Sequence, residues 1–313
     1  MGDINGVLNL NKPGGMTSRD VVDLISRPLR KVKVGHAGTL DPLATGVLVV
    51  CVGRATRLIE YVQRMPKSYR TVVRLGARSD TLDADGRIEV EESPRVPTEM
   101  EVLEALWAQV GTIDQVPPQF SALKVEGKRA YDLARVGQTV ELASRPVRID
   151  RIELLSYAWP HLELHVDCGS GTYIRSIARD VGEALRCGGL VEVLVRTRIG
   201  PFLLEDAIDP TGQTIDAILA HLRPTVEALG DLPRLVVSAE QVEAVAQGKN
   251  LFASEVEGAT GLCGEVGLVG PDGSLVAIAE IATFMEGKVG VIKPRRVLWG
   301  GKAGPASTNI LIQ

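Results

Sequence analysis

The chain has 313 residues, of which 45% are hydrophobic and 24% charged, and its net charge is −4. This composition is typical of a globular protein of one or two domains, and its apolar runs are too short for a membrane helix. Four scattered cysteines without Cys-x-x-Cys spacing argue against a disulfide framework. The first residues lack the basic-then-apolar order of a signal peptide, so we expect a cytoplasmic protein.

The charge is distributed unevenly. Residues 80–104 hold nine acids and two bases, a net charge of −7, which leaves +3 for the rest of the chain. Basic residues cluster at 27–33, 67–78, 124–129 and 293–296. Such clusters can attract phosphates on one face of a molecule, although solvated surface charge explains them equally well.

The N-terminal segment predicts a strand at 6–10, a Pro-Gly-Gly turn and a helix whose N-cap is Thr17 or Ser18. Residues 46–53 form a short β-branched run bounded by glycines, which predicts a strand buried on both faces. The segment before it is rich in glycine and includes Pro42, so we expect an irregular, stiff loop that holds Asp41 next to the core.

The middle of the chain mixes strands and helices. Residues 69–76 alternate as a strand, and "RIEV" after an Asp-Ala-Asp-Gly turn is predicted to be its hairpin partner. Residues 98–110 predict an amphipathic helix, 145–157 and 161–168 predict paired strands, and 171–185 predict a second helix. Without strict strand–helix alternation, these elements favour an α+β fold with a largely antiparallel sheet.

A domain boundary is predicted near residue 230, where glycine and proline interrupt the pattern. We therefore expect a catalytic domain at 1–230 and a small β-barrel-like module at 231–300, with a short helix and a Pro-Asp-Gly hairpin. Residues 301–313 are rich in small residues and are predicted to be a flexible tail. His161 and His165 lie in an alternating strand without neighbouring ligands, so no metal site is predicted.

Seven stretches in chain order resemble the TruB family of tRNA pseudouridine synthases. They are "NGVLNLNKPGGMTS", "GHAGTLDPLATGVL", "KSYR", "GARSDTLDADG", "PPQFSALKVEGKRAYDLAR", "CGSGTYIRSIARDVGEAL" and "LVRTRIGPF". The resemblance implies a mixed, mostly antiparallel sheet with flanking helices. The last module resembles an RNA-binding PUA domain through "GSLVAIAEI" and "KPRRVL".

The resemblance implies that the protein isomerises uridine 55 in the T-loop of tRNA to pseudouridine. The reaction breaks the N1–C1′ bond, rotates the base and joins C5 to C1′, so it needs no redox step and no cofactor. We expect tRNA as the partner, with no metal and no membrane, and a monomeric enzyme.

The resemblance also implies the site residues. Asp41 matches the catalytic aspartate, Arg175 the arginine that pairs with it, and Tyr69 the aromatic residue that stacks on the target base. Tyr173 and Leu194 match positions that line the uracil pocket. The further matches are His36, which corresponds to a histidine that contacts the loop nucleotides, and Leu190, where many relatives have histidine.

Three other functions fit the sequence less well. A catalytically silent RNA-binding or tRNA-folding protein of the same fold is disfavoured by the joint presence of Asp41, Tyr69 and Arg175. A glycoside hydrolase needs two carboxylates that flank the bond, and the acids of "DTLDADG" are expected in a hairpin turn, unpaired with Asp41. A nucleotide-binding enzyme lacks its Gly-x-x-x-x-Gly-Lys motif.

Overall fold

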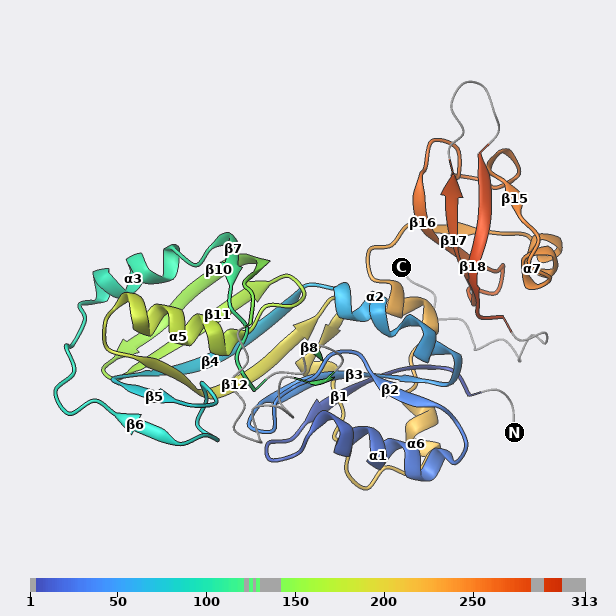
Figure 1. Ribbon diagram of the computed structural model, residues 1–313. Helices are drawn as coiled ribbons and strands as arrows, with labels where there is room; N and C mark the ends of the chain where they lie inside the picture. Colours follow the sequence, from blue (N-terminus) through green and yellow to red (C-terminus); the bar gives the residue numbers. More distant parts are fainter. Residues whose placement is uncertain (1–3, 121–123, 126–127, 130–141, 283–289, 300–313) are drawn as a thin grey trace.

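The structure is a computed structural model that describes residues 4–120, 124–125, 128–129, 142–282 and 290–299. A nine-stranded sheet occupies the N-terminal part and a five-stranded sheet the C-terminal part (Figure 1). The strands of the larger sheet are β1 (Gly6–Lys12), β2 (Val34–His36), β3 (Thr45–Val52), β4 (Lys67–Leu75), β7 (Gly111–Gln115), β10 (Arg145–Ala158), β11 (His161–Cys168), β12 (Gly189–Ile199) and β13 (Phe202–Leu203).

The order in the larger sheet is β1-β3-β12-β4-β11-β10-β7, with β2 paired to β3 and β13 paired to β12. Neighbouring strands are antiparallel except β3 and β12, which are parallel. The predicted mixed, mostly antiparallel α+β fold is therefore confirmed. The β3–β12 pair joins two halves of the sheet, and each half has its own helices.

Helices cover both halves (Figure 1). Apolar residues of α3 and α5 pack on one face of the β4–β11–β10 half. The strands β1 and β3 are covered on both faces. The helices α1 and α6 cover one face, and η1 and α2 cover the other. The predicted burial of residues 46–53 on both faces is confirmed for β3. The helices are α1 (Ser18–Leu29), η1 (Gly53–Leu58), α2 (Ile59–Arg64), α3 (Glu99–Trp107), α5 (Ile174–Ala184), η2 (Leu204–Asp206), α6 (Ile215–Ala220) and η3 (Thr225–Leu229).

Several local predictions are confirmed. Thr17 caps α1, since its side chain accepts a hydrogen bond from the Asp20 amide at 3.1 Å. The predicted strand pair forms β10 and β11, and the second predicted helix forms α5. No helix among the described residues combines the length and apolar character needed to cross a membrane.

The predicted hairpin partner of residues 69–76 is wrong. Residues 88–90 form β6 (Ile88–Val90), which pairs with β5 (Ala77–Ser79), while β4 lies between β11 and β12. Gly76 separates β4 from β5 with φ of +74°, a conformation that favours glycine and ends the strand. A second small hairpin joins β8 (Lys124–Val125) to β9 (Lys128–Arg129).

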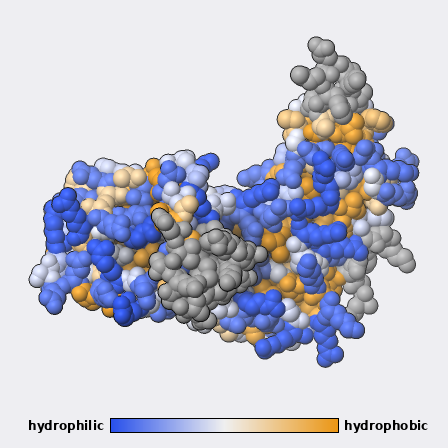
Figure 2. Space-filling model, in the orientation of Figure 1, coloured by the Kyte–Doolittle hydropathy of each residue, from blue (hydrophilic) through white to orange (hydrophobic). Residues whose placement is uncertain are grey.

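The C-terminal sheet has the order β14-β16-β17-β18-β15. Three of its buried residues, Val269, Leu275 and Ile278, pack in one cluster with Tyr61 and Phe202 of the N-terminal part. Figure 2 shows hydrophobic residues near the corner where the two parts meet. The elements are β14 (Arg234–Val236), α7 (Ala239–Ala246), β15 (Leu251–Phe252), η4 (Ala253–Glu255), β16 (Gly264–Val269), β17 (Leu275–Ala282) and β18 (Val291–Val297).

The division of the chain at residue 230 stays a prediction, because the two sheets share this apolar cluster. The predicted tail at 301–313 lies outside the described residues.

Candidate functional site

Asp41 lies in the loop between β2 and β3, and about a third of its side chain, 33%, is exposed. The loop is held at several points. The buried Lys12 ammonium donates to the Pro42 carbonyl at 3.2 Å, and the Ser18 hydroxyl accepts from the Leu40 amide at 2.8 Å. Asp41 thus lies in a loop next to the core, as expected, and the residues on both sides of it are hydrogen-bonded to other segments; the stiffness of the loop stays a prediction.

Arg175 reaches Asp41 from the first turn of α5, and its side chain is only 5% exposed. Its Nη2 atom lies 2.9 Å from Asp41 Oδ1 and also donates to the Phe120 carbonyl at 2.9 Å. Nη1 donates to the Thr81 carbonyl at 2.8 Å. The predicted pairing of Asp41 with Arg175 is therefore present. The segments that carry Phe120 and Thr81 also hold the Arg175 guanidinium in place.

Asp83 is a member of this cluster that the sequence did not reveal. Its Oδ2 lies 3.1 Å from Arg175 Nη1, and both side chains are 5% exposed. The loop that carries it is pinned to β12, where Ala84 and Leu82 exchange backbone hydrogen bonds with Val191. The expectation that the acids of "DTLDADG" are unrelated to Asp41 is wrong, because Arg175 bridges Asp83 and Asp41.

Burial and the neighbouring charges have opposing effects on the pKa of the Asp41 carboxyl. Burial raises the pKa of the Asp41 carboxyl above its usual 3.8, the Arg175 guanidinium lowers it, and the Asp83 carboxylate raises it again. The net shift of the Asp41 pKa is upward, so the effect of burial outweighs that of the Arg175 guanidinium. An anion held in place at a free-energy cost is typical of a reactive carboxylate.

Tyr69 on β4 and Leu194 on β12 lie next to the cluster of Asp41, Arg175 and Asp83. They are 7% and 6% exposed and belong to one apolar cluster with Leu40 and Ile174. Burial raises the pKa of the Tyr69 hydroxyl, and the positive charge of the nearby Arg196 guanidinium opposes that rise. An apolar surface with one polar hydroxyl beside Asp41 suits a flat heterocyclic base.

Tyr173 and His36 lie at the margins of the site. Tyr173 is the N-cap of α5, where the Gln115 side chain bonds its backbone N–H at 2.8 Å and its carbonyl at 3.1 Å, and the Arg145 guanidinium lies 5.0 Å from its ring centroid. His36 is half-buried at the end of β2, because this strand pairs with β3. Leu190 is fully buried in β12.

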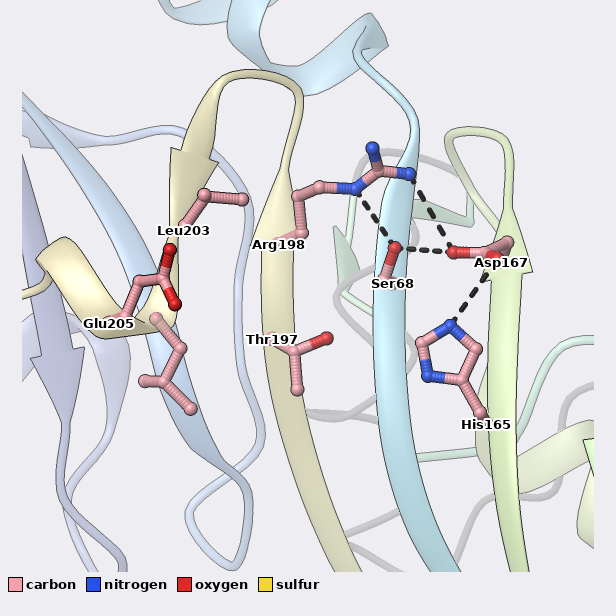
Figure 3. A pocket seen from close by; sticks show the side chains of 8 residues that line it. Ser68, His165, Asp167, Thr197, Arg198, Leu203 and Glu205 are labelled. Atoms are coloured by element: carbon pink, nitrogen blue, oxygen red, sulfur yellow. Dashed lines mark hydrogen bonds and ion pairs between the residues drawn. The ribbon is translucent and has the colours of Figure 1, made fainter. Parts of the chain in front are cut away.

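An open pocket of about 430 Å³ lies on the other face of the central sheet (Figure 3). Residues adjacent along a strand point to opposite faces, so Ser68 faces away from the side that Tyr69 faces. In the pocket, the Ser68 hydroxyl donates to Asp167 Oδ1 at 2.5 Å, and Arg198 Nε donates to Ser68 Oγ at 3.0 Å. This polar network is separate from the Asp41 site.

Comparison with known proteins places the chain in a family. Residues 26–174 match the family model described as TruB family pseudouridylate synthase, N-terminal domain. The chain is 48% identical over 263 residues to a tRNA pseudouridine synthase B of Cereibacter sphaeroides, which covers 81% of this chain and 86% of the relative. The chain belongs to the TruB family of pseudouridylate synthases. A tRNA pseudouridine synthase B of Mycobacterium sp. (strain KMS) is 42% identical, with 92% and 96% covered.

Solved structures agree with this membership in the TruB family. A Cbf5–Nop10–Gar1 complex matches with a TM-score of 0.72 and 26% identity, over 94% of this chain and 85% of that chain. The structure of an H/ACA RNP bound to a substrate RNA containing 2′-deoxyuridine matches with a TM-score of 0.71 and 25% identity, with the same shares covered. The nine-stranded sheet and the C-terminal sheet therefore follow a known arrangement.

The sequence also gave no signal for two polar residues of this TruB-family site. Gln115, 1% exposed, fixes the Tyr173 backbone, and Arg196, 2% exposed, lies beside Tyr69. Gln115 lies in β7 and Arg196 in β12. The described residues contain no group of three or more His, Cys, Asp and Glu side chains that could hold a metal ion.

Proposed function

We propose that this protein isomerises uridine 55 in the T-loop of tRNA, with Asp41 as the catalytic group. As a member of the TruB family it is a pseudouridine synthase, an isomerase that acts on tRNA. The observation that carries the assignment to Asp41 is its 2.9 Å contact with the buried Arg175 guanidinium, directly beside Tyr69 and Leu194.

The chemistry suits this arrangement. The N1–C1′ bond of uridine breaks, the base rotates, C5 joins C1′, and the proton lost from C5 is balanced by the one gained at N1. The Asp41 carboxylate can attack the sugar or the base, or remove a ribose proton. Each of these routes needs Asp41 ionised, and Arg175 favours that form.

A stacked base cannot reach Asp41, so the uridine must leave the T-loop stack. Extrusion costs a few kcal/mol, which stacking on an aromatic ring and phosphate contacts must offset. Tyr69 offers the ring, and Leu194 and Tyr173 lie where they can bound the base. His36, at the end of β2, suits a contact with neighbouring nucleotides of the loop.

The direct test uses an unmodified tRNA transcript and a T-arm stem-loop. The purified protein is incubated with each RNA in the presence of EDTA, and pseudouridine is mapped at single-nucleotide resolution. We expect pseudouridine at position 55 in both RNAs, and none in a transcript with cytidine at that position. Tight tRNA binding without any pseudouridine would support the alternative of a catalytically silent tRNA-folding protein.

We further propose that the enzyme works as a monomer in the cytoplasm. All the side chains that we assign to the site, from Asp41 to Leu194, come from one chain, so no second copy is needed to complete it. The cytoplasm is the compartment in which tRNA is abundant.

The C-terminal sheet is proposed to be a PUA-like RNA-binding module, with the exposed Lys293 of β18 as a phosphate contact. A truncation at residue 230 is a poor test, because it would expose the shared apolar cluster. Instead, Lys293→Ala should weaken binding of full-length tRNA and reduce the slope of log K against log salt by about 1. Binding of the T-arm stem-loop should not change. The control is Lys249→Ala, an exposed lysine of the same part, and an unchanged salt slope for Lys293→Ala would refute the contact.

The activity is expected to fall as the pH drops, with a midpoint above the usual Asp pKa, because protonated Asp41 is inactive and burial raises its pKa. Asp83→Asn removes a nearby negative charge that raises this pKa, so the acid limb should shift to lower pH. Single-turnover rates measured across pH 4–8 give both midpoints. An acid limb that stays in place or moves upward in Asp83→Asn would show that Asp83 does not act on Asp41.

Tyr69→Phe is expected to bind T-loop RNA better than Tyr69→Leu, because only phenylalanine keeps the ring face. Stacking on an aromatic ring contributes about 1–3 kcal/mol per base, so the leucine variant should lose at least about fivefold more affinity. Equilibrium binding to a T-arm stem-loop measures the difference. Equal losses in the two variants would mean that Tyr69 does not stack on the base, and a slower chemical step in Tyr69→Phe alone would assign a role to the hydroxyl.

A further inference from the structure

The site is assembled across a seam in the nine-stranded sheet. The Asp41 loop belongs to the half that contains β1, β2 and β3, whereas Tyr69 lies on β4 in the other half. In the described strands, the ladder that joins the halves consists of two residue pairs, Val195 with Thr45 and Arg196 with Gly46. A seam this short leaves the distance between Asp41 and Tyr69 to be fixed by side chains.

Arg196 crosses this seam. Its side chain is 2% exposed, and its Nε atom donates to the Val47 carbonyl at 2.8 Å. Nη1 donates to the Thr39 carbonyl at 3.4 Å and Nη2 to the Gly38 carbonyl at 3.2 Å. These acceptors lie on both sides of Asp41 in the chain, so one guanidinium holds the start and the end of the Asp41 loop.

The backbone of Arg196 is tied to the other half of the site. Arg196 pairs with Tyr69 across the β12–β4 ladder, so the two side chains lie next to each other on the same face of the sheet. Arg196 is therefore the cross-strand neighbour of Tyr69, which is proposed to stack on the base. It also holds the loop that carries Asp41, the proposed catalytic group. Gly46 permits this approach, since a Cβ there would lie 2.3 Å from the Arg196 carbonyl oxygen.

A β-bulge directs Arg196 toward the site. Arg196 pairs with Tyr69 but Arg198 pairs with Ser68, so Thr197 is one extra residue in β12. Arg196 and Arg198 consequently face opposite sides of the sheet, and Arg198 enters the Ser68–Asp167 network of the rear pocket (Figure 3). Bulges occur often beside active sites, where they re-aim a side chain.

A buried guanidinium carries a large desolvation penalty, and the three hydrogen bonds above go to backbone carbonyls and not to a carboxylate. A protein that keeps such a desolvation penalty at Arg196 typically does so because the residue has a function. We propose that Arg196 is a positioning residue for the isomerisation: it sets the distance between Asp41 and the base on Tyr69. This inference rests on the proposed function of Asp41 and Tyr69.

The test compares Arg196→Met, Arg196→Lys and the matched control Arg198→Met on a T-arm stem-loop. A small misplacement of reacting groups can cost about 100-fold in rate, so we expect a loss of that order in the single-turnover rate of Arg196→Met. The Kd for RNA should change less than about threefold, since the base still meets Tyr69 and Leu194. Arg198→Met should keep the wild-type rate, because its side chain faces the other side of the sheet.

The pH profile separates positioning from a general loss of structure. The Arg196 charge lowers the pKa of Asp41, so its removal in Arg196→Met should move the acid limb to higher pH. Arg196→Lys keeps the charge and should keep the limb in place, with a rate between those of Arg196→Met and the wild type. If Arg196→Met does not fold, the rate of Arg196→Lys decides: a loss of tenfold or more with unchanged Kd supports the proposal.

Three results would overturn the proposal while leaving the function intact: a wild-type rate in the folded Arg196 variants, an equal loss in Arg198→Met, or a loss confined to RNA affinity. A wild-type protein that forms no pseudouridine would instead refute the proposed function itself. The two failures are thus distinguishable in one set of assays.

Discussion

Asp41→Asn is expected to abolish pseudouridine formation while tRNA binding stays close to that of the wild type. The amide keeps the size and most contacts of the carboxylate but lacks its charge and basicity, which every proposed route requires. Acid–base catalysis alone contributes about 10²–10⁴-fold, so the single-turnover rate should fall by at least a hundredfold. Mapping of pseudouridine in a T-arm stem-loop, together with equilibrium binding, measures both quantities.

A melting curve is the control for this variant. Because burial raises the pKa of Asp41, the folded state is penalised for its charge at neutral pH, and the amide removes this penalty. The melting temperature of Asp41→Asn should therefore not fall below that of the wild type. More than about a hundredth of wild-type turnover in the variant would exclude Asp41 as the catalytic group.

Arg175→Gln is expected to lose stability as well as activity. It leaves the Asp83 carboxylate, 5% exposed, without its guanidinium partner, and removal of one partner from a buried ion pair costs about 3–5 kcal/mol. Asp41 also loses the cation that favours its charged form, so the rate should drop with it. Urea unfolding gives the free-energy change, and the single-turnover assay gives the rate.

The double variant Arg175→Gln/Asp83→Asn separates the two effects. Without a buried, unpaired carboxylate, it should recover part of the lost stability, yet activity should stay low because Asp41 still lacks Arg175. If the double variant is no more stable than Arg175→Gln, the contact between Arg175 and Asp83 does not account for the loss.

The sequence predicted most elements and the centre of the site. Local patterns were sufficient for these: alternation for β11, a capping residue at Thr17, and a glycine-bounded apolar run for β3. Asp41 was found because Pro42 and the glycines around it define a loop, and because the surrounding motif resembles that of a known family. Such signals are carried by residues close together in the chain, so no fold is needed to read them.

Other features depended on residues far apart. The sequence predicted the wrong partner strand for residues 88–90, because strand pairing depends on which strands meet in space. It also treated Asp83 as an ordinary turn residue.

By itself, then, the sequence determined the α+β class, the loop of Asp41 and the resemblance to the pseudouridine synthases. The folded chain was needed to show that Asp83 shares Arg175 with Asp41, and that Arg196 holds the Asp41 loop while it pairs with Tyr69 across the sheet. The physical reason is that a buried charge is stable only where partners converge on it. Gly38 and Arg196 are 158 positions apart, and no local pattern records their contact.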